Sequence, residues 1–219
     1  MDKNYILYII PIVVLIINRT PYIGKYVRVV NTLIHESGHA IAALISRGEV
    51  YSVELFSDTS GTAITKTKGK LSQFIVSIAG YPFGSIVAYF MFYLVSIENY
   101  KLIFYIITCF AVLNLMFYVR NTFGIFWLIS FTILVFAVYF YGGEFMQYAV
   151  SAGLSGVILF EAFYSSIELV IIAYKKPKSA GDATNLQYIT GIPAILWALL
   201  FVAQSAYFIY LSIMLFFIP

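Results

Sequence analysis

The chain has 219 residues, of which 62% are apolar and only 11% are charged, whereas soluble domains carry about 25% charged residues. This composition excludes an ordinary soluble domain and predicts one integral membrane domain over residues 1–219. The net charge of +3 is interpreted as membrane topology, because no basic tract interleaved with aromatic residues suggests a nucleic-acid partner. The single cysteine, Cys109, cannot form an intramolecular disulfide.

Apolar runs recur at lengths that suit membrane-spanning helices, which need about 20 residues each. The predicted fold is all-α and polytopic, with six or seven spans. These spans are residues 5–17, 27–45, 71–95, 102–119, 125–141, 145–174 and 192–217. The first run is short, and it is interpreted as an uncleaved anchor because no small-x-small cleavage site follows Ile17.

Residues 49–70 differ from the apolar runs around them. Apolar and polar residues alternate over 50–55 and again over 62–67, and Asp58-Thr59-Ser60-Gly61 between them supplies turn residues. This pattern predicts a short β-hairpin inserted after the second span, with an exposed loop as the alternative. If the hairpin lies beside the second span, its open edge could receive an extended peptide strand.

Two later spans contain residues that are unusual in a bilayer. Gly80, Pro82 and Gly84 in residues 71–95 predict a kink or a close helix approach. Glu161 and Glu168 lie seven residues apart and therefore on nearly the same helix face. We expect these carboxylates to face protein, water or the interface rather than lipid, and both a functional and a structural role remain open.

The loops predict the orientation of the chain in the membrane. With seven spans, one side carries nine basic residues, and these are Lys3, Arg47, Lys66, Lys68, Lys70, Arg120, Lys175, Lys176 and Lys178. The other side carries four, and these are Arg19, Lys25, Arg28 and Lys101. The positive-inside rule then places the N-terminus and Asp182 on the cytoplasmic side.

The second span contains the only two histidines of the chain, His35 and His39, with Glu36 directly after the first. This is the H-E-x-x-H pattern. Positions i and i+4 lie one helical turn apart, so both imidazoles can bind one metal ion, and Glu36 would lie beside it as the general base. The alternative, a hydrogen-bonded pair of core histidines, is disfavoured because buried ionisable groups in a span are costly without a function.

Catalytic zinc usually has three protein ligands, and the sequence has no third histidine. The remaining donor must be a cysteine or a carboxylate, and the candidates are Glu54, Asp58, Cys109, Glu161, Glu168 and Asp182. Asp182 is the best placed, directly after Gly181 at the edge of an apolar run. The same position in the chain suits the N-cap of a helix equally well.

Several motifs, taken in this order, resemble the site-2-protease-like intramembrane zinc metalloproteases, in particular their compact bacterial-type branch. These motifs are His35-Glu36-Ser37-Gly38-His39, the hairpin with Ser60-Gly61, Ala79-Gly80-Tyr81-Pro82, Arg120-Asn121-Thr122-Phe123-Gly124, Asp182-Ala183-Thr184-Asn185-Leu186 and Thr190-Gly191-Ile192-Pro193. The resemblance covers residues 27–197.

This resemblance implies that Zn²⁺ is bound by His35, His39 and Asp182, and that Glu36 activates water. It also implies a transmembrane or membrane-associated protein substrate, cleaved in or near the lipid bilayer, and a location in the cytoplasmic membrane of a bacterium. The sequence departs from the better-studied members, which carry Asn-Pro-Asp-Gly or Leu-Asp-Gly where this chain has Gly181-Asp182-Ala183. It also has no PDZ-like insertion.

The leading hypothesis is therefore an intramembrane zinc metalloendopeptidase. A zinc-binding scaffold or client-binding protein of the same family, without turnover, is the alternative. A metal transporter is disfavoured, because no string of polar ligands crosses several spans. For the enzyme, a donor to the developing oxyanion is needed, and the candidates are Asn114, Asn121 and Asn185.

Overall fold

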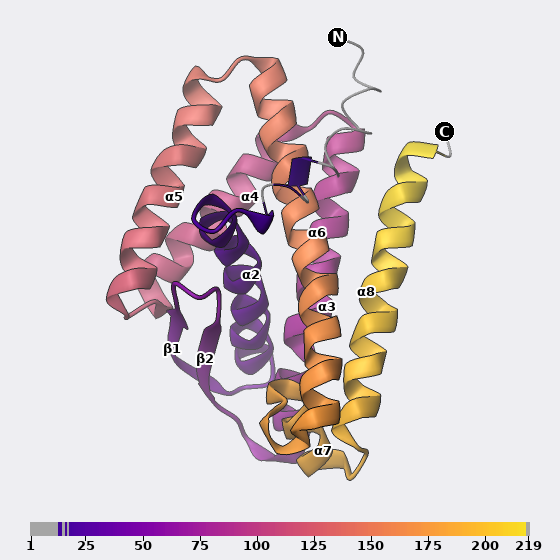
Figure 1. The fold of residues 1–219 in the computed structure, drawn as a ribbon. Helices are drawn as coiled ribbons and strands as arrows, with labels where there is room; N and C mark the ends of the chain where they lie inside the picture. Colours follow the sequence, from indigo (N-terminus) through magenta and orange to yellow (C-terminus); the bar gives the residue numbers. More distant parts are fainter. Residues whose placement is uncertain (1–12, 15, 17, 218–219) are drawn as a thin grey trace.

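The computed structural model describes residues 13–14, 16 and 18–217, so most of the predicted first span lies outside the described residues. The described part forms seven α-helices and one β-hairpin (Figure 1). In chain order the elements are α2 Ile23–Ile45, β1 Glu49–Leu55, β2 Gly61–Lys66, α3 Gly69–Ser96, α4 Tyr100–Leu113, a π-helical turn Asn114–Tyr118, α5 Thr122–Tyr141, α6 Glu144–Lys175, a 3₁₀ turn Pro177–Ser179, α7 Gly181–Thr190 and α8 Ala194–Phe217.

Five of the described helices are long and apolar enough to cross a membrane, namely α3, α4 with its π-helical turn, α5, α6 and α8. Their bounds lie within a few residues of the predicted spans, which confirms the all-α polytopic membrane fold. The 23 residues of α2 extend over about 34 Å, which is also enough to cross. Helix α2 is not counted among these five helices because its charged and polar residues make it less apolar than they are.

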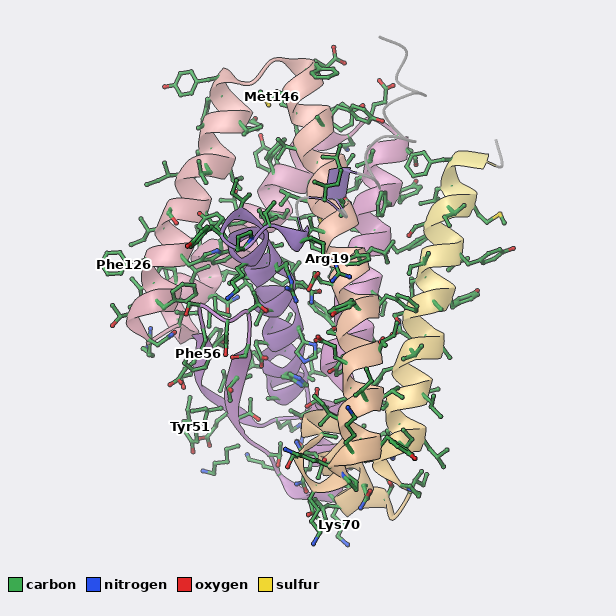
Figure 2. The ribbon with its side chains drawn as sticks, in the orientation of Figure 1. Arg19, Tyr51, Phe56, Lys70, Phe126 and Met146 are labelled. Carbon is green, nitrogen blue, oxygen red and sulfur yellow. The ribbon has the colours of Figure 1, made fainter. Side chains whose placement is uncertain are left out.

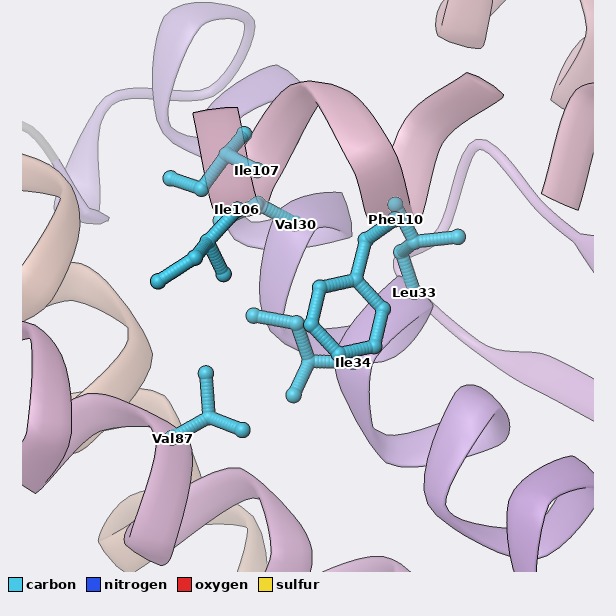
Figure 3. Close-up of a pocket in the computed structure, with 7 residues that line it drawn as sticks. All are labelled: Val30, Leu33, Ile34, Val87, Ile106, Ile107 and Phe110. Atoms are coloured by element: carbon cyan, nitrogen blue, oxygen red, sulfur yellow. The ribbon is translucent and has the colours of Figure 1, made fainter. Parts of the chain in front are cut away.

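Helix α2 lies inside the bundle, packed against α3, α6 and the hairpin (Figure 1). Figure 3 shows one of its sides, where Val30, Leu33 and Ile34 contact Val87 of α3 and three apolar residues of α4. These side chains leave no space for a water molecule. Close packing of this kind, rather than water exclusion, holds helices together in lipid, and it fixes the rotation of α2.

The predicted hairpin is confirmed as two antiparallel strands, with Val53 opposite Ala63. In its turn the Asp58 carboxylate accepts hydrogen bonds from the backbone N–H and the hydroxyl of Ser60. The Thr32 hydroxyl of α2 donates to the Thr59 carbonyl at 2.6 Å. The hairpin is therefore attached to α2 one turn before Glu36.

Further contacts cover only one edge of the hairpin. The Asn121 side chain donates to the Leu55 carbonyl and accepts from the Leu55 N–H, and Val119 forms a bridge with Val53. Both contacts are made by β1. The outer edge of β2 pairs with no strand of the described residues.

The last two helices meet at a sharp turn. Gly191 caps the end of α7 with a φ of +77°, which suits glycine. Helix α8 begins after Pro193, two residues later than the predicted span. The ends of α2 and α6 lie beside α7 at one end of the bundle, where Figure 2 labels Lys70. Basic residues gather in the segments at this end, and they are Arg47, Lys66, Lys68, Lys70, Lys175, Lys176 and Lys178.

Candidate metal centre

His35 and His39 project from adjacent turns of α2 and meet at their ring nitrogens. The two Nε2 atoms lie 3.1 Å apart, and the rings meet edge to face at 4.8 Å. The Nδ1 atom of His39 hydrogen-bonds to the Val76 carbonyl of α3 at 2.7 Å. This bond orients the ring so that Nε2 faces the site, in the manner of outer-shell partners of metal-binding histidines.

Asp182 completes the cluster from the first turn of α7. Its Oδ2 atom lies 3.4 Å from His35 Nε2 and 3.2 Å from His39 Nε2. The N-cap of α7 is Ala180 rather than Asp182, so the capping alternative is wrong. Thr184 organises this turn, because its hydroxyl accepts from the Ala180 N–H and donates to the Pro177 carbonyl.

The charge of Asp182 also suits a ligand. Burial alone would raise the pKa of its carboxyl. The His39 charge and the hydrogen bonds from both imidazoles lower this pKa by more than burial raises it. The net pKa lies below the usual range. Asp182 is therefore present as the carboxylate, the form that binds metal.

The spacing of the three donor atoms fits a metal ion. Tetrahedral zinc with bonds of about 2.0–2.1 Å holds its ligand atoms about 3.3 Å apart, and the observed separations are 3.1, 3.2 and 3.4 Å. Two imidazole nitrogens and one carboxylate oxygen are a donor set of catalytic zinc sites. Within the described residues this is the one such group.

The other carboxylate and thiol candidates for the third ligand lie elsewhere. Asp58 is bonded to Ser60 in the hairpin turn, Glu161 pairs with an arginine, and Cys109 is exposed on α4. Glu54 and Glu168 are also outside the cluster.

Gly80 of α3 leaves room for the two imidazoles. A Cβ atom at this position would lie 2.5 Å from both His35 Cε1 and His39 Nε2. The sequence predicts a close approach here, and the structure shows that the approaching groups are the histidine rings. Sequence reasoning gave no role to Tyr81, whose ring meets His35 edge to face at 4.8 Å and stacks on Phe201.

Glu36 lies against the hairpin. Its side chain is buried, and the backbone of Ala63 on β2 lies close to its carboxylate. Gly61 of β2 also lies against this side chain, because a Cβ atom there would lie 3.1 Å from Glu36 Oε1. Strand β2 therefore holds Glu36 beside the cluster.

A cavity of about 460 Å³ joins these groups. Its walls come from α2, β2, α3, α6 and α7. They include the cluster, Glu36 and neutral polar residues, which are Thr62, Thr65, Thr67, Gln73, Ser77 and Asn185.

The three asparagine candidates for an oxyanion donor occupy different places. Asn185 lines the cavity. Asn121 is engaged with Leu55 of β1, and Asn114 donates to the Ser37 hydroxyl. Of the three, only Asn185 lines the cavity that the cluster also lines.

A polytopic helical bundle that holds two histidines, a glutamate and a distant aspartate around one cavity has the architecture of a membrane metallopeptidase of the site-2 protease type. A family model described as Peptidase M50B-like matches residues 6–212. The chain therefore belongs to this family, whose members are typically zinc-dependent. Comparisons with curated proteins and with solved structures find no match.

Proposed function

We propose that this protein is a zinc metalloendopeptidase that hydrolyses peptide bonds of transmembrane or membrane-associated proteins. The convergence of His35 Nε2, His39 Nε2 and Asp182 Oδ2 within 3.4 Å carries this proposal. Glu36 beside these atoms and the adjoining cavity add a general base and a place for substrate. When bound, the zinc ion supplies Lewis-acid polarisation of the peptide carbonyl and acidifies water.

The residues of the chain have separate roles in this reaction. Glu36 removes a proton from the attacking water and then delivers it to the nitrogen of the leaving amine. The Val76 carbonyl keeps the His39 ring oriented, and Asn185 is placed to donate a hydrogen bond to the developing oxyanion. The contact with β2 keeps the Glu36 carboxylate directed at the reacting atoms.

The substrate is a segment that can unwind and become extended. Peptide bonds in a membrane helix are hidden by their own hydrogen bonds, so cleavage requires local unfolding. The unpaired edge of β2 borders the cavity and offers backbone groups to an extended segment, as in strand addition. Because β2 also contacts Glu36, this binding mode brings the segment to the general base.

The depth of the site favours membrane substrates over soluble ones. His39 lies six residues before the end of α2, or about 9 Å along the helix. The basic residues at this end of the bundle favour a cytoplasmic position for it by the positive-inside rule. We infer that substrate is cleaved near the cytoplasmic surface, reached by water through the cavity, in the cytoplasmic membrane of a bacterium.

The proposal is tested by reconstituting the zinc-loaded protein with a library of transmembrane peptides and identifying products by mass spectrometry. Wild type is expected to cleave peptides of the library. Glu36→Gln is expected to retain zinc but lose at least about a hundredfold in rate. Glu144→Gln, at the exposed start of α6, is the matched control and should cleave at the wild-type rate.

Two results would contradict the proposal. If zinc-loaded wild type cleaves no peptide, the scaffold alternative is favoured. If Glu36→Gln cleaves as fast as wild type while retaining zinc, Glu36 is not the base.

A further inference from the structure

The face of α6 that carries Glu161 is directed at α2. Glu161 Oε2 accepts a hydrogen bond from Arg28 Nε of α2 at 2.7 Å, and its Oε1 accepts one from Asn18 at 3.3 Å. Glu168 lies seven residues later, and seven residues return to nearly the same side of a helix. By this period Glu168 belongs to the side of α6 that faces α2, and its side chain is exposed there.

Glu168 lies close to the cavity that adjoins the metal cluster. It is seven residues from the end of α6, or about 10 Å, whereas His39 is about 9 Å from the end of α2. The two helix ends lie at the same end of the bundle (Figure 1). The next residue, Leu169, lines the cavity, and the Glu168 charge acts on Tyr81 beside His35.

The two glutamates of this face differ in their partners. Glu161 is buried and paired, whereas Glu168 is exposed and forms no hydrogen bond or ion pair with another described residue. On the same face, the Arg19 guanidinium is positioned over the Tyr164 ring at 5.5 Å. Glu168 is thus a carboxylate in a membrane-spanning helix, next to the cavity-lining Leu169, and no cation of the described residues pairs with it.

An uncompensated carboxylate at membrane depth is costly and marks a place where a partner charge binds. A transmembrane substrate carries such charges, because the cytoplasmic ends of membrane helices are enriched in lysine and arginine. Long basic side chains also reach several ångströms along the membrane normal. A segment extended along β2 would bring such a side chain past Glu168.

We propose that Glu168 is an acidic subsite that binds a lysine or arginine side chain of the substrate close to the scissile bond. This inference rests on the proposed peptidase function and adds a substrate preference to it. Glu168 determines specificity and takes no part in the bond cleavage, which Glu36 serves.

The experiment uses transmembrane peptides that are identical except at one residue, which is lysine, methionine or glutamate and is moved in turn through the positions around the cleavage site. At one position, wild type should cleave the lysine peptide about tenfold faster than the methionine peptide, the ratio expected for one charge-assisted hydrogen bond. Glu168→Gln should cleave the methionine peptide at the wild-type rate and lose the preference for lysine. Glu168→Lys should prefer the glutamate peptide.

Zinc content and thermal stability are measured for each variant, so that misfolding is recognised, and Glu144→Gln is the control for loss of a negative charge elsewhere on α6. Equal lysine-to-methionine ratios in wild type and Glu168→Gln, with both peptides cleaved, would overturn the subsite while leaving the peptidase intact. Absence of cleavage of every peptide by wild type would instead overturn the proposed function.

Discussion

Helix α2 carries two groups of ionisable residues, and they differ in what surrounds them. Arg28, near its start, pairs with Glu161 of α6 at 2.7 Å. His35 and His39, two and three turns further on, converge on Asp182 of α7. In the first group the opposite charges compensate each other. In the second, three atoms that can each bind a cation point at one place beside a cavity.

This difference separates a structural polar group from a reactive one inside a membrane domain. In a buried ion pair the two charges compensate each other, and removing one partner leaves the other charge buried and unpaired. A set of converging donors needs a further cation, and the adjoining cavity gives water and substrate access to it. We therefore expect changes in the first group to alter folding and changes in the second to alter metal binding.

Breaking the Arg28–Glu161 pair should have the largest effect on stability. Arg28→Met leaves Glu161 buried without a countercharge and should lower the free energy of unfolding by about 3 kcal/mol, measured by denaturation in detergent. Zinc bound per folded molecule should stay at the wild-type value. The double variant Arg28→Met/Glu161→Leu should recover most of the loss. If Arg28→Met lost zinc and kept its stability, Arg28 would serve metal binding rather than folding.

Filling the space at Gly80 should have the converse effect. In Gly80→Ala the new Cβ meets both imidazoles at 2.5 Å, so zinc affinity should fall about 10- to 100-fold, as for other changes beside metal ligands. Gly84→Ala, one turn on, is the matched control, because its Cβ meets Asn31 at an ordinary 3.4 Å. Competition with a zinc-binding dye measures both. Equal zinc affinities of the two variants would refute the arrangement.

A smaller and local effect is expected where the hairpin is attached to the bundle. Asn121→Ala removes the two hydrogen bonds to Leu55 and should ease local opening by about 1–2 kcal/mol. Hydrogen exchange at the Leu55 amide should then be faster by about tenfold. Asn121→Asp, which keeps the acceptor, should show about half of this free-energy change. Unchanged exchange would mean that Val119 alone holds β1.

The smallest effect is expected for the exposed ion pair of the hairpin. Lys66 and Glu49 lie 3.4 Å apart on the hairpin and are both exposed. Exposed pairs contribute little to stability, so Lys66→Gln should leave the melting temperature and the zinc content unchanged. A clear fall in the melting temperature would show that an exposed pair also stabilises the fold. Burial would then not explain the large effect expected for the Arg28–Glu161 pair.

The sequence predicts the helices and the first two candidate metal ligands because their signals are local. Apolar runs determine the spans, and the spacing of His35 and His39 follows from the helical period. The hairpin is likewise predicted by its alternation and by Asp58 in its turn. The positions of Gly80 and Val76 around the imidazoles depend on how α3 packs against α2, and no local pattern contains that information.

Long-range pairings required more than spacing. Asp182 could be a ligand or an N-cap by sequence alone, and the fold of α7 places its carboxylate beside both histidines. Glu161 and Glu168 look equivalent in the sequence. They differ because Arg28 pairs with Glu161, whereas Glu168 is exposed. Asn114 and Asn121, both candidate donors, instead serve packing and hairpin attachment.

Zinc content shows whether Asp182 acts together with the two histidines as a ligand. Wild type and Asp182→Ala are purified in parallel and analysed by elemental mass spectrometry, with Asp58→Ala in the hairpin turn as the control. We predict equimolar zinc in wild type and in Asp58→Ala, and loss of zinc in Asp182→Ala at unchanged helical content. Undiminished zinc in folded Asp182→Ala would contradict the site.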